Sequence, residues 1–156
     1  MSYNAENGKG ADMNGLEFKT AQPEDAEAIF RLCKENIDKY EDINSIPYDE
    51  VIGWVRRKIN KFISEYTRVY KDGELCGYYR FHPDGDKYEL DDFYLFESYR
   101  GQGIGSAVLE KCLGEADKTV YLYVFKRNEG AVRLYKRSGF EVREDLDTRY
   151  IMEKKL

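Results

Sequence analysis

Three glycines stand within five residues in the segment Gly101-Gln102-Gly103-Ile104-Gly105, and an apolar-periodic run follows at once. Glycine reaches backbone conformations that are closed to other residues, at a cost of roughly 0.5–1 kcal/mol per residue in regular structure. A ligand that needs bare backbone N–H groups close by would offset that cost. Because N–H groups at the start of a helix bind anions, the segment predicts a phosphate-binding loop at a helix N-terminus.

Two common phosphate loops do not fit this segment. A P-loop ends in Gly-Lys-Ser or Gly-Lys-Thr, whereas Gly105 is followed directly by Ser106. A dinucleotide-binding fingerprint has its third glycine at the sixth position, where this chain has Ser106. The acidic residue expected about 20 positions later is also missing, because that region reads TVYLYVF. A tight strand-to-helix turn that needs glycine for its geometry alone is the structural alternative.

A third pattern fits the loop and extends beyond it. Residues Arg100 to Gly105 have the form Arg/Gln-x-x-Gly-x-Gly/Ala, which resembles the pyrophosphate-binding signature of the GCN5-related N-acetyltransferases (the GNAT family). The segment LDDFYLFESYRGQGIGSAVL resembles the family's central strand, loop and helix, and NEGAVRLYKRSGF resembles its Asn-x-x-Ala-x-x-Leu-Tyr-x-x-x-Gly-Phe segment. TAQPEDAEAI is similar to the family's N-terminal helix entry. The resemblance covers the chain from about Leu16 to Lys155.

The resemblance implies a fold and a cosubstrate. The fold is of the α/β (α+β) class, with residues 15–156 forming a single N-acetyltransferase domain. Its mixed, mostly antiparallel sheet has about six to seven strands, is splayed at its centre, and is flanked by about four helices. The cosubstrate is acetyl-CoA, and no metal is implied. Its pantetheine arm would pair with the strand before the loop, and its diphosphate would bind the loop amides. The cofactor-binding residues implied in this way are Phe93, Tyr94, Leu95, the loop Arg100–Ser106 and Asn128.

The resemblance also implies catalytic residues. Tyr135 matches the tyrosine that protonates the departing CoA thiolate, although it falls on the inner face of its helix and a core tyrosine is the alternative. An alkyl ammonium with a pKa of about 10.4 needs a base, and a carboxylate with a raised pKa suits this role. Glu89 aligns with the base of the histone-acetylating branch, Asp91 with an acidic position of aminoglycoside-type members, and Asp92 is a third candidate. A solvated, bulged strand end explains the same three residues structurally.

The expected reaction is direct transfer of an acetyl group to a primary amine of a small molecule or peptide in a ternary complex. A non-catalytic acyl-CoA-binding or regulatory module on the same fold is the alternative. Acidic residues in EDINSIPYDE, together with Trp54 and several tyrosines, indicate a cationic acceptor. N-terminal acetylating enzymes of the ribosome carry a glutamate where this chain has Tyr123, which argues against their specific reaction. The basic residues Arg133, Lys136 and Arg137 either attract the phosphates of the cosubstrate or form a solvated helix face.

These residues need a scaffold, and the hydrophobic pattern predicts one. A strand at residues 16–20 precedes a helix that runs to about Tyr40, and a second helix buries Val51, Ile52, Val55, Ile59 and Phe62. Asp72-Gly73 between apolar runs predicts a hairpin, and HPDGD a second turn before the strand KYELDDFYLF. After the glycine loop and a helix of about ten residues, TVYLYVF is a strand. NEGAVRLYKRSGF is a short helix that ends near Gly139, and FEVREDL and RYIMEKK form a final hairpin.

Composition limits the classes of function. The chain has 156 residues and a net charge of −5, which argues against general nucleic-acid binding. No stretch approaches the ~20 apolar residues of a membrane helix, and no apolar segment follows the N-terminus, so a cytoplasmic protein without a membrane partner is expected. Residues 1–14 are expected to be a disordered leader, with Met13 as an alternative start. Cys33, Cys76 and Cys112 are expected to be reduced and buried, and His82 to be a surface or strand-end residue. The pattern leaves open whether the chain forms a homodimer.

Overall fold

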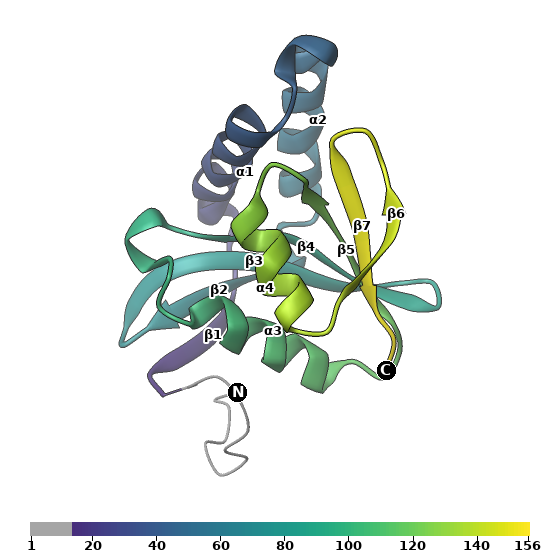
Figure 1. Cartoon of the computed structure of the whole chain (residues 1–156). Helices are drawn as coiled ribbons and strands as arrows, with labels where there is room; N and C mark the ends of the chain where they lie inside the picture. The colour runs from purple at the N-terminus through teal and green to yellow at the C-terminus, as the bar shows by residue number, and fades with distance from the viewer. Residues whose placement is uncertain (1–13) are drawn as a thin grey trace.

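One sheet between two pairs of helices organises the chain in this computed structural model, which describes residues 14–156 (Figure 1). The sheet has seven strands in the order β1-β2-β3-β4-β5-β7-β6. All neighbouring strands are antiparallel except β4 and β5, which run parallel. The strands are β1 (Leu16–Thr20), β2 (Tyr66–Lys71), β3 (Glu74–Asp84), β4 (Lys87–Leu95), β5 (Val120–Phe125), β6 (Glu141–Asp145) and β7 (Arg149–Lys154).

The helices divide between the two faces of the sheet. They are α1 (Ala26–Tyr40), α2 (Tyr48–Lys61), α3 (Ile104–Glu115) and α4 (Glu129–Arg137). One buried cluster joins α1 and α2 to the sheet, and the other joins α3 and α4 to it. Because side chains alternate along a strand, Tyr78 on β3 belongs to the first cluster and its neighbour Tyr79 to the second.

The parallel pairing of β4 with β5 is short. It joins Tyr88 with Val120 and Glu89 with Tyr121, and it continues no further among the described residues. Beyond that point the two strands diverge, and Figure 1 shows β5 rising away from β4. The sheet is therefore split from Leu90 onward, although β4 stays paired with β3 on its other edge.

A bulge marks β4 at the place where the split opens. The register between β3 and β4 shifts between the pairs Tyr78–Tyr94 and Arg80–Asp91, which leaves an extra residue on β4. Asp92 lies in this bulge with φ +48°, a left-handed conformation that is uncommon outside glycine. Bulges of this kind bend a strand and redirect its side chains, and they occur often beside active sites.

The sequence patterns predicted this architecture closely. The fold class, the first strand, the four helices and all three hairpins are confirmed within one to three residues. The leader expected at residues 1–14 falls, apart from Asn14, outside the described residues. Cys33, Cys76 and Cys112 are buried free cysteines, as expected. No helix in the described part of the chain is long and apolar enough to cross a membrane.

Candidate active site

The split sheet opens into a cavity of about 1020 Å³. It is lined by residues of α1 and α2, by β4 and β5 at the split, and by α4 together with Asn128, the residue before it. Three predicted groups of residues lie on this one cavity: the carboxylates of β4, the strand residues Phe93 and Tyr94, and the pair Asn128 and Tyr135. The lining also includes Trp54, whose side chain is largely exposed.

The glycine loop precedes α3, and its backbone requires glycine at two positions. Gly101 has φ +74° and Gly103 has φ +82°, and an added Cβ at either would meet nothing within 4 Å. Backbone conformation, not crowding within the chain, therefore demands glycine here. The amide of Ala107 donates to the carbonyl of Gly103 at 3.2 Å, so the loop amides before it belong to the unsatisfied start of the helix.

Other loop residues connect this helix start to the rest of the site. A Cβ on Gly105 would lie 3.2 Å from Cδ2 of Leu134, so glycine permits close packing of α3 against α4 beside Tyr135. Two loop side chains brace the chain itself: Arg100 Nε donates to the carbonyl of Leu95 at 3.0 Å, and Gln102 Nε2 donates to that of Ser98 at 2.9 Å. The loop is thereby fastened to the end of β4.

Tyr135 and Asn128 line the cavity from α4 and the residue before it. Asn128 caps α4, because its Oδ1 accepts a hydrogen bond from the amide of Ala131 at 3.2 Å. Tyr135 is buried and packs edge-on against Phe140. Within the described chain no side chain or backbone group forms a hydrogen bond with its hydroxyl. Burial raises the pKa of Tyr135, which keeps its proton in place until an acceptor arrives.

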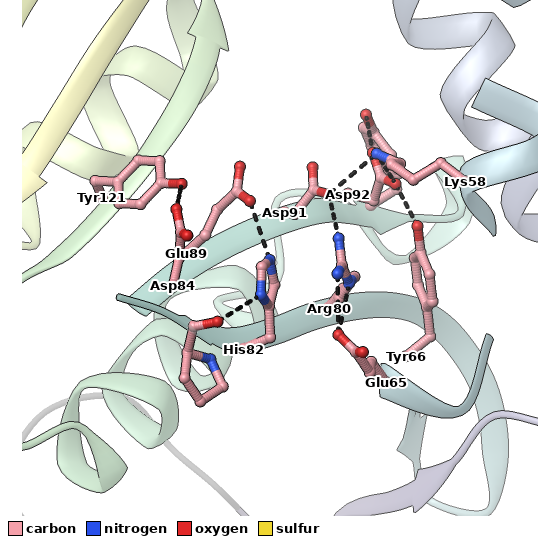
Figure 2. Close-up of polar contacts among 12 residues, drawn as sticks. Lys58, Glu65, Tyr66, Arg80, His82, Asp84, Glu89, Asp91, Asp92 and Tyr121 are labelled. Carbon is pink, nitrogen blue, oxygen red and sulfur yellow. Dashed lines mark hydrogen bonds and ion pairs between the residues drawn. The ribbon is translucent and has the colours of Figure 1, made fainter. Parts of the chain in front are cut away.

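The predicted carboxylates on β4 have different partners (Figure 2). Lys58 of α2 lies 3.0 Å from Asp91 Oδ2 and 2.8 Å from Asp92 Oδ2. Asp91 also faces Arg80 Nη1 at 3.3 Å, and the hydroxyl of Tyr66 donates to Asp92 at 2.6 Å. The bulge is therefore held by cations from two other elements.

Glu89 is separate from this cluster. Its Oε1 lies 3.0 Å from Nε2 of His82 on β3. Burial and the nearby charge of Asp91 raise the pKa of Glu89, and His82 and Lys58 oppose that rise. Burial and Asp92 raise the pKa of Asp91, against the opposing effect of Lys58.

The structure corrects two expectations about these residues. The bulged strand end exists, but it is not solvated, because the side chains of Asp91 and Asp92 are only 19% and 8% exposed. His82 does lie near the end of a strand, but it is half-buried and bonded to one of the candidate bases. The pairing of His82 with Glu89 was predictable from the turn, because the hairpin that pairs Asp84 with Lys87 also pairs His82 with Glu89.

The remaining predicted residues lie around the site. The Tyr94 hydroxyl is 3.5 Å from Asn36 Nδ2 on α1, and the Phe93 ring packs edge-on against Tyr79. Tyr123 is exposed on the cavity wall, with the guanidinium of Arg149 above its ring at 5.1 Å. The basic residues of α4 are all exposed and do not line the cavity: Arg133, Lys136 and Arg137. In the described part of the chain, no group of three or more potential metal ligands gathers.

Comparisons with known proteins find the same arrangement. Residues 26–140 match the model of the acetyltransferase (GNAT) family. The spermidine N(1)-acetyltransferase of Thermoplasma acidophilum is 27% identical over 162 residues, which cover 90% of this chain and 97% of that protein. The PaiA N-acetyltransferase of the same organism, solved in complex with coenzyme A, superposes with a TM-score of 0.69. It is 23% identical and the match covers 90% of this chain and 99% of that one.

A stretch of higher identity is shorter. The spermine/spermidine N(1)-acetyltransferase of Bacillus subtilis is 33% identical over 92 residues, which cover 51% of this chain and 60% of that protein.

A sheet split beside a glycine loop and a capped helix is the fold of the N-acetyltransferase class. Since the family model matches most of its length, the chain belongs to the acetyltransferase (GNAT) family, which confirms the resemblance found in its motifs.

The Lys58 contacts generate a stability prediction. Burial alone would lower the pKa of Lys58, but the charges of Asp92 and Asp91 raise that pKa. The Lys58 side chain therefore stays protonated. Lys58→Met leaves two half-buried carboxylates without this cation, and breaking such pairs costs about 3–5 kcal/mol. We expect a loss near the lower limit, because Arg80 and Tyr66 remain. Urea unfolding followed by circular dichroism measures it.

The pH dependence and a control sharpen this test. Without Lys58 the pKa of Asp91 rises further, so the folded state binds its proton more tightly and loses stability as pH rises above ~4. The difference from wild type should therefore be larger at pH 7 than at pH 4. Lys34→Met removes an exposed pair with Asp38 and should cost much less, because solvent screens exposed ion pairs. Equal losses in the two variants would contradict the assignment.

Proposed function

We propose that the chain is an acetyl-CoA-dependent N-acetyltransferase that moves an acetyl group to a primary amine by direct transfer in a ternary complex. One observation carries this proposal: a single cavity is lined by Tyr135 and Asn128 and also by residues of α2, β4 and β5. Two substrates could thus meet in one cavity at the split. Acetyl-CoA, when bound, supplies the thioester that is the source of the acetyl group.

The described residues fit such a cosubstrate. The positive-φ glycines leave open space at the start of α3, where the loop amides can donate to a diphosphate. Hydrogen bonds to charged groups contribute roughly 1.5–3 kcal/mol each, so a few of them exceed the conformational cost of the loop. In the described part of the chain, the edge of β4 at Phe93, Tyr94 and Leu95 has no strand partner on the β5 side, which suits an extended pantetheine chain.

The acid and the base follow from the different surroundings of the residues. Tyr135 holds a proton that no described group shares, so we assign it the protonation of the departing thiolate. Glu89 is a better base than Asp91, because Asp91 is already paired with Lys58 and Arg80. Glu89 lines the cavity and keeps one carboxylate oxygen outside its contact with His82.

Protons balance across this scheme. An ammonium acceptor loses two N–H protons as the N–C bond forms and the C–S bond breaks. Tyr135 donates its hydroxyl proton to the departing sulfur and is reprotonated, through solvent, by one of the two amine protons. Glu89 removes the other amine proton. The net reaction converts an ammonium and an acetyl thioester into an amide, a thiol and one released proton.

We propose a positively charged amine as the acceptor. The names of the relatives support this, because the Bacillus subtilis and Thermoplasma acidophilum proteins are polyamine acetyltransferases by name. Glu41 and Glu89 are the cavity carboxylates that Lys58 and Arg80 leave unneutralised.

An amine panel tests the acceptor. Spermidine should be acetylated with kcat/KM at least about 10-fold above that of a singly charged alkylamine, which corresponds to one further ionic contact of about 1.4 kcal/mol. Acetyl-CoA consumption and product mass measure it. A preference for amines that carry a carboxylate would contradict the proposal and would shift attention to the exposed cations Arg57, Lys61 and Arg149 on the same cavity.

Tyr135→Phe tests the chemistry. General acid catalysis contributes about 10²- to 10⁴-fold, so kcat should fall at least 100-fold while the Kd for CoA by calorimetry changes less than about 3-fold. Tyr150→Phe is the matched control, since Tyr150 lies on β7 and does not itself line the cavity, and it should retain wild-type activity.

Kinetic order and the rival function are decided in the same assay. Intersecting initial-velocity lines with varied acetyl-CoA and amine support direct transfer, whereas parallel lines would contradict it. Binding of CoA without turnover of any amine would favour the non-catalytic acyl-CoA-binding module.

Three buried thiols without a disulfide are typical of a reducing compartment, which supports a cytoplasmic location.

A further inference from the structure

Glu89 and His82 form a pair with unusual proton requirements. They face each other across the β3–β4 hairpin, with Nε2 of His82 3.0 Å from Oε1 of Glu89. The other ring nitrogen, Nδ1, lies 3.0 Å from the backbone carbonyl oxygen of Pro83 (Figure 2). Each side chain is only 16% exposed.

These two contacts fix the number of protons on the pair. A carbonyl oxygen only accepts, so Nδ1 must carry hydrogen to bond with Pro83. A neutral imidazole has one N–H, and its Nε2 would then present a lone pair to Glu89. Two acceptors do not attract each other at 3.0 Å. The pair therefore shares a proton, either as imidazolium and carboxylate or as imidazole and carboxylic acid.

The surrounding groups act on these two forms in opposite directions. Lys58 from α2 lies on the cavity side and favours the carboxylate, whereas burial and Asp91, two residues along β4, disfavour it. Tyr121 of β5 stands opposite Glu89 in the parallel register, and its hydroxyl donates to Asp84. Asp91 is itself paired with Lys58 and Arg80, which reduces its repulsion of Glu89. Among the described residues, His82 is the basic side chain in direct contact with Glu89.

We propose that His82 is a positioning residue, which as an imidazolium holds Glu89 as a carboxylate and directs its second oxygen toward the acceptor amine. This rests on the proposed acetyl transfer. The imidazolium occupies Oε1, and Oε2 stays available on the cavity wall. When the amine N–H bond breaks, an O–H bond forms at Oε2 and one positive charge passes from the substrate to the pair. The pair returns to its starting state by releasing that proton to water.

His82 is the chain's only histidine, so a nitrogen-15 imidazole spectrum reports this residue alone. On the full, tag-free chain at pH 7 we expect both ring nitrogens to be protonated. In Glu89→Gln the ring should be neutral, with hydrogen retained on Nδ1. A neutral wild-type ring, or the same protonation in both proteins, would overturn the proposal. This measurement needs no substrate, so it decides the pair even if acetyl transfer is not observed.

The pH dependence of kcat/KM provides the functional test. In His82→Gln the ionisation limb of Glu89 should move to higher pH by at least about 1 unit, since an adjacent opposite charge lowers a carboxyl pKa by about 1–3 units. His82→Lys, which keeps a permanent cation, should leave the limb at or below its wild-type position. Arg143→Gln, a control that removes one exposed cation on β6, should not move it. Loss of rate in both His82 variants with an unmoved limb would overturn the proposal.

Discussion

The parting of β4 from β5 after two residue pairs is the constraint on which the rest of the structure depends. A continuous sheet would leave no cavity, and the two faces would be separated by backbone. The bulge at Asp92 and the early end of the parallel ladder turn the middle of the sheet into a passage. Helices α1 and α2 close one side of this passage, and α3 and α4 flank the other (Figure 1).

A split sheet exposes polar groups that need partners, and the chain provides them with charges. Lys58 and Arg80 neutralise Asp91 and Asp92, so the bulge is stable without being free to titrate as a base. Glu89, at the last paired position before the split, has His82 as its one direct side-chain partner among residues 14–156. The same carboxylate-rich segment thus has two parts: one holds the strand in shape, and the other lines the cavity.

Much of this was predictable from local patterns. Helical spacing of apolar residues, the turn at Asp72-Gly73 and the glycine loop each depend on neighbours within a few residues, so the elements came out close to their observed bounds. The surroundings of the β4 carboxylates were not predictable in this way, because the contact of Lys58 with Asp91 joins residues 33 positions apart. Side-chain partners at that distance depend on how α2 packs. The His82–Glu89 pair could have been predicted from the sequence, because hairpin register alone places the two residues opposite each other.

Calorimetric titration of CoA into wild type, Gly103→Ala and Gly85→Ala tests whether the glycine loop before α3 binds the cosubstrate. Both glycines have positive φ and open space around them, so alanine strains both backbones similarly, by about 1–2 kcal/mol. Of these two glycines, only Gly103 lies directly before the first residue of α3. We expect binding by wild type and Gly85→Ala, and at least 10-fold weaker binding by Gly103→Ala, as expected when one charged hydrogen bond of roughly 1.5–3 kcal/mol is lost. Equal affinity in all three proteins, or no binding by wild type, would contradict it.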